Sequence, residues 1–310
     1  MHSETTRRYL DDERFARLRD RRASDPASIA ELHATRTRRP VLGDNGRLFI
    51  IAADHPARGA LGIGDDPMAM ADRYDLLDRL ALALSRPGVD GVLATPDIID
   101  DLALLGALDG KVVAGSMNRG GLRGSSFEMD DRFTGYDIDG IVRDRLDFAK
   151  VLLRINLHDA GSIATIEACS AAVTAAAAAG VPIMLEPFMS EHGPAGVVNN
   201  LSADAVATSV AIASGLGTSS AYTWLKLPVV DEMERVMAAT TLPTLLLGGE
   251  RSGDPEATYA SWQRALALPG VRGLVVGRTL VYPPDGDVAR AVDTAAALVH
   301  AGPTRPKEHP

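Results

Sequence analysis

Two kinds of segment alternate along the chain. Short runs of β-branched and aliphatic residues are followed by longer segments rich in alanine and leucine, in which apolar positions recur at helical spacing. This pattern predicts eight strands, at 48–54, 91–95, 111–115, 150–156, 182–188, 223–228, 243–247 and 273–276. It also predicts eight helices, at 67–84, 97–108, 136–146, 161–179, 202–214, 231–239, 255–268 and 287–299.

Residues that begin and end helices stand at several of these boundaries. Ser202 and the pair Asp254-Pro255 each precede a helical segment, while Gly180 and Gly270 each end one and are followed by valine and a new strand. Eight alternating strands and helices favour an α/β fold, a closed (β/α)8 TIM barrel. An open doubly wound sheet is the alternative, but no Gly-x-Gly-x-x-Gly motif follows the first strand.

Three regions are predicted from this pattern: an N-terminal helical arm at 1–44, a barrel catalytic domain at 45–301 and a C-terminal tail at 302–310. In the arm, acidic residues interrupt the arginines, which is typical of a solvated, salt-bridged helix face. We expect its helices to cover the bottom of the barrel or to reach a neighbouring subunit.

Composition narrows the choice of partner. The chain is 46% hydrophobic and 24% charged, which is ordinary for a globular protein, and its net charge of −9 argues against nucleic acid or an anionic membrane as the main partner. Its one cysteine, Cys169, excludes a disulfide within the chain and is expected to be a buried thiol. No secretory signal stands at the N-terminus and no apolar run is expected to span a membrane, so we expect a cytoplasmic protein.

Lysine is scarce in this chain, with four lysines against 28 arginines, and one of them lies in an apolar strand. Lys226 is flanked by Trp224, Leu225, Leu227 and Pro228. A desolvated lysine can lose its proton and act as a nucleophile, whereas arginine cannot, so Lys226 is a candidate Schiff-base lysine. The alternative is a strand-end lysine whose aliphatic stem packs on its neighbours while its head reaches water.

Polar residues recur at the carboxyl ends of the predicted strands, where TIM barrels carry their active sites. Asp54 ends the first strand, Lys150 and Arg154 lie on the fourth, and Glu186 lies on the fifth. Side chains alternate along a strand, so Lys150 and Arg154 share a face. If that face and Lys226 both point inward, nearby cations and desolvation lower the pKa of Lys226, and Glu186 and Asp54 supply proton transfer. An ion-pair layer filling the barrel interior is the structural alternative.

Two further segments are candidates for binding substrate. Gly248 and Gly249 follow the seventh strand and Gly277 and Arg278 follow the eighth, where barrels frequently bind phosphate. The other segment is the long loop at 116–133, because long ordered loops on the catalytic face are commonly functional. Its candidate substrate contacts are Asn118 and Arg119. His55, beside Asp54, and Arg154 of the fourth strand are further candidates for binding substrate.

Other chemistries have less support. The seven histidines are scattered, without His-x-His or His-Glu-x-x-His, so no metal site is predicted. No Gly-x-Ser-x-Gly motif indicates a serine nucleophile either.

Taken in order, these motifs resemble a known family. With Asp54-His55, the strand from Lys150 to Arg154, Leu185-Glu186-Pro187, Leu225-Lys226-Leu227-Pro228, Gly248-Gly249 and Gly277-Arg278, the chain resembles class I aldolases of the deoxyribose-phosphate and tagatose-bisphosphate aldolase superfamily. It looks closest to a bacterial (β/α)8 aldolase-like family associated with inositol catabolism. The resemblance covers about residues 45 to 300.

The resemblance implies an activity and residue roles. Lys226 matches the lysine that forms the imine, and Glu186, Asp54 and Lys150 match the residues that assist it. The implied function is cleavage of a phosphorylated keto or deoxy sugar, of a deoxy-keto-gluconate phosphate or deoxyribose phosphate type, without metal or organic cofactor and in a homo-oligomer. Pro56 and Ala57 depart from the family pattern, as does the loop at 116–133, so a relative's substrate does not carry over. The alternatives are a non-catalytic sugar-phosphate-binding barrel and a sugar-phosphate isomerase or epimerase with Glu186 as base.

Overall fold

Eight parallel strands close into a barrel in the computed structural model, which describes residues 8–118, 121–194, 196–248 and 254–301. Their order around the barrel is β4-β3-β2-β1-β9-β8-β7-β5, and pairing of β4 with β5 closes it. The strands are β1 (Leu48–Ala52), β2 (Gly91–Ala94), β3 (Val112–Ser116), β4 (Phe148–Ile155), β5 (Ile183–Gly193), β7 (Thr223–Pro228), β8 (Thr244–Leu247) and β9 (Val271–Val276). The predicted (β/α)8 fold is confirmed.

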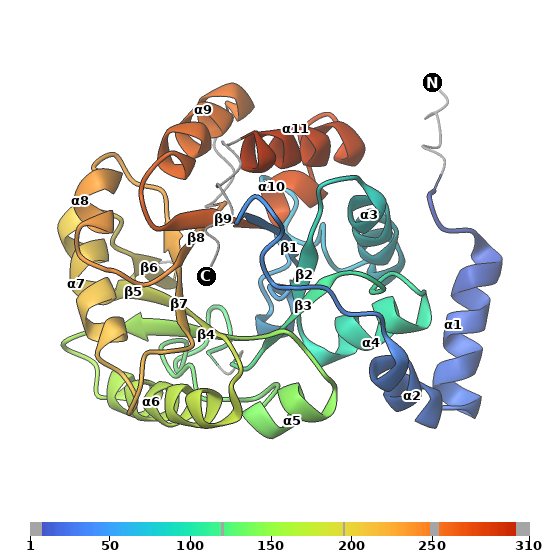
Figure 1. Ribbon diagram of the computed structural model, residues 1–310, viewed down its shortest axis with the longest axis horizontal. Helices are drawn as coiled ribbons and strands as arrows, with labels where there is room; N and C mark the ends of the chain where they lie inside the picture. Colours follow the sequence, from blue (N-terminus) through green and yellow to red (C-terminus); the bar gives the residue numbers. More distant parts are fainter. Residues whose placement is uncertain (1–7, 119–120, 195, 249–253, 302–310) are drawn as a thin grey trace.

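Helices surround the barrel (Figure 1). They are α3 (Arg73–Ser85), α4 (Pro96–Leu104), α5 (Ile138–Arg143), α6 (Gly161–Ala179), α7 (Ala203–Ser214), α8 (Met233–Met237), α9 (Pro255–Leu266), α10 (Arg278–Val281) and α11 (Val288–His300). A large apolar core lies between them and the outward faces of the strands. The inward faces form a separate core, in which the rings of Phe148 and Trp224 meet edge to face with centroids 5.3 Å apart. Because the interior is packed with side chains, the space available to a ligand lies at the carboxyl ends of the strands.

The largest differences from the predicted boundaries have local causes. The helix predicted at 67–84 begins only at Arg73, because the Asp72 side chain accepts hydrogen bonds from the backbone N–H groups of Tyr74 and Asp75 and so caps α3 there. Residues 67–70 form turns instead. The short α10 was not predicted.

Beyond Phe188, β5 continues as one arm of a hairpin. Its last residues pair antiparallel with β6 (Gly196–Asn199), and Ser190 lies opposite Asn199. The strand predicted at 182–188 thus ends too early, because β6 is too short to give a strand signal of its own.

The N-terminal helices lie outside the barrel, next to α4 (Figure 1). They are α1 (Asp12–Ser24) and α2 (Ala27–Thr35). Phe15 packs edge to face on Tyr74 of α3 at 5.0 Å between centroids, and Arg22 binds Asp101 of α4 at 2.6 Å. The helices therefore use their apolar residues against α3 and α4 and do not cover the bottom of the barrel, which was one of our two expectations. Contact with a neighbouring subunit, the other expectation, stays a prediction.

An extended segment after α2 covers the N-terminal end of the barrel instead. The buried guanidinium of Arg36 donates to the backbone oxygens of Lys111 and Arg145, each at 2.7 Å, and to Asp147 at 3.0 Å. Further along, Val41 and Leu42 pack on the inner core of the barrel.

Helix α6 corrects one sequence expectation. It has 19 residues and a mean hydropathy of 1.4 over an 18-residue window, so by length and composition alone it is sufficient to span a membrane. A third of that window is buried, and α6 packs against β4 within the helical ring. Its apolar residues thus serve, at least in part, the outer core of the barrel.

Candidate active site

Three neighbouring strands carry charged side chains into the open end of the barrel. Leu152 of β4 pairs with Glu186 of β5, and Leu185 of β5 pairs with Leu225 of β7. Glu186 thus lies beside Lys226 on one side and near Lys150 on the other, since inward positions alternate along each strand. Lys150 and Lys226 both point inward, as expected from the sequence.

These side chains form a continuous chain of ion pairs. Nζ of Lys226 lies 2.5 Å from Oε1 of Glu186, and Nζ of Lys150 lies 2.5 Å from Oε2 of the same carboxylate. Lys150 also lies 3.1 Å from Oδ2 of Asp54, which accepts a hydrogen bond from Ser116 at 3.1 Å. The Glu186 carboxylate therefore joins the two lysine amines, and the Asp54 carboxylate binds the second of them, Lys150.

Burial makes this chain of contacts chemically significant. The side chains of Lys150 and Asp54 are fully buried, that of Lys226 is 4% exposed and that of Glu186 is 11% exposed. Removing four charges from water is expensive, and mutual pairing offsets the cost. Hydrogen-bonded acids and bases at these distances can exchange protons, so the arrangement can carry a proton from Lys226 through Glu186 toward Lys150 and Asp54.

A cavity of about 790 Å³ opens above the ion pairs. Lys226 and Glu186 form part of its floor, and its walls come from loops after β1, β3, β8 and β9 and from the β5–β6 hairpin. The volume is in the range of small-molecule sites. A second hollow, on the outer face of α6, is lined by apolar and small residues with Glu167 as its one charged group, and it contains none of the predicted site residues.

His55 lines the cavity next to the ion pairs. Its Nδ1 lies 3.7 Å from Oδ1 of Asp54 and makes no hydrogen bond to any described residue. Burial, and then the charges of Arg278 and Lys226, hold the pKa of His55 well below its usual value. A neutral imidazole can donate or accept a hydrogen bond to a substrate hydroxyl without carrying charge.

The glycines predicted to bind phosphate lie on the opposite wall from β4. Gly248, Gly277 and Arg278 line the cavity, while Gly249 lies outside the described residues. A Cβ at position 277 would meet the backbone oxygen of Ala52 at 2.3 Å, so only glycine fits there. The close packing of β9 on β1 thus favours glycine at position 277, which lines the cavity without a side chain.

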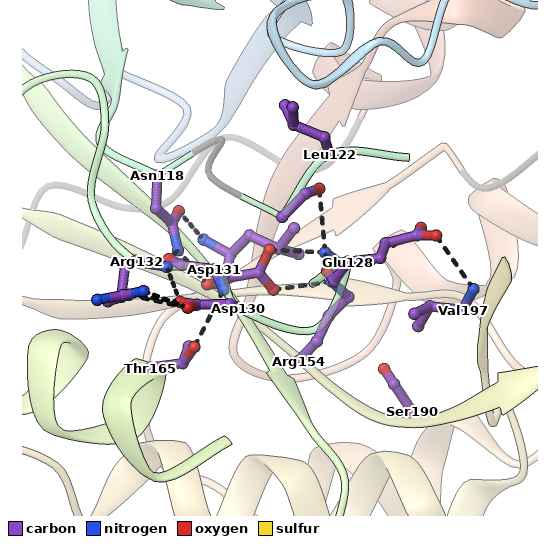
Figure 2. Close-up of polar contacts among 12 residues, drawn as sticks. Asn118, Leu122, Glu128, Asp130, Asp131, Arg132, Arg154, Thr165, Ser190 and Val197 are labelled. Carbon is purple, nitrogen blue, oxygen red and sulfur yellow. Dashed lines mark hydrogen bonds and ion pairs between the residues drawn. The ribbon is translucent and has the colours of Figure 1, made fainter. Parts of the chain in front are cut away.

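Arg154 has a different environment from the one predicted. It lines the cavity, but its guanidinium binds both carboxylate oxygens of Asp131 at 2.7 Å and Oε1 of Glu128 at 3.4 Å (Figure 2). It also donates to the backbone oxygens of Glu128 and Gly121. These contacts fasten the loop at 121–133 to β4.

Asn118 anchors the same loop from below. Its side chain is fully buried, donates to the backbone oxygens of Asp131 and Leu152 at 2.7 and 2.5 Å, and accepts from the backbone N–H of Leu152 at 2.7 Å (Figure 2). Asn118 does not line the cavity, so we infer that it holds the loop and does not contact the substrate. Arg119, the neighbouring candidate, lies outside the described residues.

Sequence reasoning overlooked three parts of the cavity. Arg58, at the end of the 3-10 helix η1 (Pro56–Arg58), lines it, and so does Arg123 from the long loop. Glu128 bridges that loop and the hairpin, because its Oε2 accepts from the backbone N–H groups of Gly124 at 2.8 Å and Val197 at 3.4 Å. Arg58 lies only a few residues after Asp54 and His55, and this closeness in the sequence was the available signal that it lines the same cavity.

Residues suited to metal binding do not gather in the described part of the chain. No group of three histidine, cysteine or acidic side chains there has the geometry to hold a metal ion. The single thiol, Cys169, is buried in α6, and burial raises its pKa.

Comparisons with solved structures give the same fold. A Cgl0159 structure from Corynebacterium glutamicum is 65% identical, with a TM-score of 0.93 over 95% of this chain and 99% of that chain. An archaeal fructose 1,6-bisphosphate aldolase is 18% identical, with a TM-score of 0.61 over 88% of this chain and 100% of that one. A fructose-bisphosphate aldolase from Slackia heliotrinireducens is 14% identical, with a TM-score of 0.57 over 92% and 94%. At such identities the two aldolases share the fold with this chain.

Sequence comparison identifies the family. A search of curated protein sequences finds no match. The model of the family described as Cgl0159-like matches residues 46–296, which is most of the chain and includes all eight strands of the barrel. With that match and the 65% identity to the Corynebacterium glutamicum protein, the chain belongs to the Cgl0159-like family.

Proposed function

We propose that the protein is a class I aldolase in which Lys226 forms a Schiff base with a sugar-phosphate substrate. The observation that carries this proposal is the contact of Lys226 with Glu186 at the floor of a cavity, in series with Lys150 and Asp54. An amine nucleophile needs a partner that removes its proton and later moves protons at the substrate. Glu186 is within hydrogen-bonding distance of the amine and lines the cavity in which the substrate would lie.

The proposed reaction begins at the substrate carbonyl. The neutral amine of Lys226 attacks the carbonyl carbon, and the carbinolamine that results is protonated on oxygen and loses water to give an iminium ion. Glu186, resupplied through Lys150, is the acid that donates this proton. When the C–C bond breaks, its electron pair moves into the iminium group and gives an enamine.

The remaining steps balance protons and water. A base removes the proton of the hydroxyl group on the departing carbon, which leaves as an aldehyde. The enamine is then protonated on carbon, and water hydrolyses the iminium ion to release the second carbonyl product and free Lys226. Asp54 is fully buried and does not line the cavity, so we propose that it acts as the base through His55, which lies 3.7 Å away and does line the cavity.

A phosphate at Gly248, Gly277 and Arg278 would hold the substrate in register with Lys226, which turns binding energy into orientation. The proposed substrate is a phosphorylated keto or deoxy sugar, which is what the family resemblance implies. One fold neighbour, an archaeal fructose 1,6-bisphosphate aldolase, is described with its catalytic lysine bound to a carbinolamine intermediate, which supports the same chemistry for this fold. Membership of the deoxyribose-phosphate branch and a place in inositol breakdown are part of the proposal from resemblance alone.

Borohydride trapping tests the proposal. The protein is incubated with a panel of phosphorylated sugars and triose phosphates, reduced with borohydride and mapped by mass spectrometry. We expect a stable adduct on the peptide that contains Lys226, and none in Lys226→Ala. Lys111→Ala is the matched control, because Lys111 is also partly buried beside a strand but lies at the other end of the barrel.

Each outcome has a distinct meaning. An adduct on Lys226 establishes the imine, and its mass reports the trapped fragment. Absence of an adduct with any ligand, while a sugar phosphate still raises the melting temperature, would contradict the aldolase mechanism. Turnover without an adduct would favour an isomerase with Glu186 as base, and binding without turnover would favour a sugar-phosphate-binding barrel.

A further inference from the structure

The carboxylate of Glu128 lies where two walls of the cavity meet. The loop at 121–133 contributes Arg123 and Glu128 to the cavity, and the β5–β6 hairpin contributes residues 196–199. The side chain of Glu128 is only 5% exposed. Burial of a carboxylate costs free energy unless its oxygens accept hydrogen bonds, so the partners of Glu128 show which parts of the structure it holds together.

Both oxygens of Glu128 have partners, and these come from three elements (Figure 2). Oε1 lies 3.4 Å from Nη1 of Arg154 on β4. Oε2 accepts from the backbone N–H of Gly124 at 2.8 Å, within the loop, and from the backbone N–H of Val197 at 3.4 Å, on the hairpin. One buried side chain therefore connects the loop, β4 and the hairpin.

The hairpin is shaped so that its backbone approaches this carboxylate closely. Strand β6 is the last in the sheet order, and an edge strand has backbone N–H groups that no strand pairs. Val197 donates from β6 to Glu128. The preceding residue, Gly196, has a φ of +116°, and a Cβ there would lie 3.0 Å from Oε2 of Glu128. Glycine at 196 thus permits both the backbone conformation and the close contact.

A second contact holds the hairpin from its outer side. His192, which is paired with Val197 across the two strands, lies 2.6 Å from Asp159 in the loop between β4 and α6. The side chains of His192 and Asp159 are 52% and 26% exposed, so water screens this pair. The contact through Glu128 is buried, and we therefore expect it to contribute more to the position of the hairpin.

We propose that Glu128 is a positioning residue, which holds the loop at 121–133 and the β5–β6 hairpin together as one wall over the substrate. This inference rests on the proposed function, since it takes the substrate to lie above Lys226. In the described part of the chain Glu128 binds neither Lys226 nor Glu186, so its effect is on substrate binding, through the positions of Arg123 and Val197. The bond-making steps at Lys226 do not need it.

Hydrogen exchange, followed by peptide mass spectrometry, tests the proposal. It is measured on the wild type, Glu128→Ala, Glu128→Gln and the control Glu191→Gln, which changes an exposed carboxylate of the same hairpin. In Glu128→Ala we expect the peptide that contains Val197 to exchange about tenfold faster or more, because its backbone loses a hydrogen bond to a charged acceptor. Unchanged exchange of that peptide would overturn the proposal.

Glu128→Gln separates the backbone hydrogen bonds from the charge. Its amide oxygen can still accept from the two backbone N–H groups, whereas its amide N–H groups face the guanidinium of Arg154, which is also a donor. We therefore expect faster exchange in the loop at 121–133, with a smaller change in the hairpin than in Glu128→Ala. Glu191→Gln should exchange as the wild type does. An equal change of the hairpin in Glu191→Gln and Glu128→Ala would contradict a specific role of Glu128.

A measurement on the unmodified protein covers the case in which Glu128→Ala does not fold. Exchange of the wild type is repeated at rising urea concentrations below the unfolding transition. Segments that open together share one opening free energy and one dependence on urea. The peptides of the loop and of the hairpin should therefore converge on a common opening, and separate openings at every urea concentration would contradict a shared wall.

Borohydride trapping separates this inference from the proposed function. With dihydroxyacetone phosphate, the concentration that half-saturates adduct formation on Lys226 should rise about tenfold in Glu128→Ala, while the rate at saturation stays near that of the wild type. Equal half-saturating concentrations would refute the positioning role and keep the aldolase. No adduct in either protein, with faster exchange of the hairpin in Glu128→Ala, would refute the aldolase and keep the contact between loop and hairpin.

Discussion

Nζ of Lys226 lies 2.5 Å from Oε1 of Glu186, on the adjacent strand of the barrel. The other oxygen of the same carboxylate binds Lys150, so Glu186 is the group that connects the proposed nucleophile to the rest of the site. A buried carboxylate with two lysine partners is well placed to pass a proton between them.

Glu186→Gln should slow imine formation while leaving Lys226 in place. The amide has nearly the shape of the carboxylate but cannot take up a proton, so we expect the rate to fall by about 10²–10⁴-fold, the usual contribution of a general acid or base. Quenched-flow borohydride trapping with dihydroxyacetone phosphate measures this rate. Glu191→Gln, at an exposed position of the same strand, is the control and should be unaffected. An unchanged rate in Glu186→Gln would show that another group moves the proton.

Arg154 should contribute strongly to stability. It is buried and paired with Asp131, and removal of one partner from such a pair leaves an unpaired buried charge, which costs about 3–5 kcal/mol. We therefore expect Arg154→Met to lower the free energy of unfolding in urea by that amount and to increase hydrogen exchange in the loop at 121–133.

The matched control for Arg154 lies in the same loop. Arg132 also binds an aspartate, Asp130, but its side chain is 69% exposed, so water screens the pair and Arg132→Met should change stability little. Equal losses in the two variants would mean that the loop is not fastened by the buried pair.

His55 should make the protein less stable in acid. Its pKa in the folded state is held well below 6.5, chiefly by burial, whereas the unfolded chain takes up a proton as the pH falls through about 6.5. Below that pH the unfolded state binds more protons at this position, so the free energy of unfolding falls, by up to about 1.4 kcal/mol per pH unit.

The prediction for His55 is tested as a difference between two proteins. Urea unfolding of the wild type and His55→Gln is compared between pH 8 and pH 5. Near pH 8 histidine is neutral in both states, so any offset there reports packing only. Below pH 6.5 the wild type should lose stability faster than the variant, and parallel curves would contradict a depressed pKa at His55.

Gly277→Ala should be destabilising because of the approach of β9 to β1. The new Cβ would lie 2.3 Å from the backbone oxygen of Ala52, and strand β1 would have to shift. Overpacking of this kind typically costs about 1–3 kcal/mol, which thermal or urea unfolding would detect. Gly215→Ala is the control, since its nearest neighbour would be the Ile212 oxygen at 3.6 Å and its φ is −88°. Equal stability of the two variants would mean that β1 tolerates the shift.

Strand periodicity was enough to show which polar residues share a face. The alternation of side chains is a local property of an extended backbone, so Lys150 and Arg154 could be assigned to one face of their strand, while an inward direction of that face and of Lys226 was a condition of the prediction. For the same reason α6 was predicted at its observed bounds, because its long alanine-rich pattern ends at Gly180 in the left-handed conformation.

The use of the remaining polar residues depended on tertiary structure. Arg154 shares the inward face of β4 with Lys150, yet it binds the loop at 121–133. The hydrogen bonds of Asn118 hold the same loop. Arg58, by contrast, is left without a partner among the described residues at the mouth of the barrel. The partner of a long side chain on a strand end or loop depends on how the loops fold around it. No local sequence pattern determines that folding. The chain's own periodicity thus determined the barrel and which strand residues share a face, whereas the closed barrel decided that the lysines point inward, and loop packing decided which arginine holds the fold and which one lines the cavity.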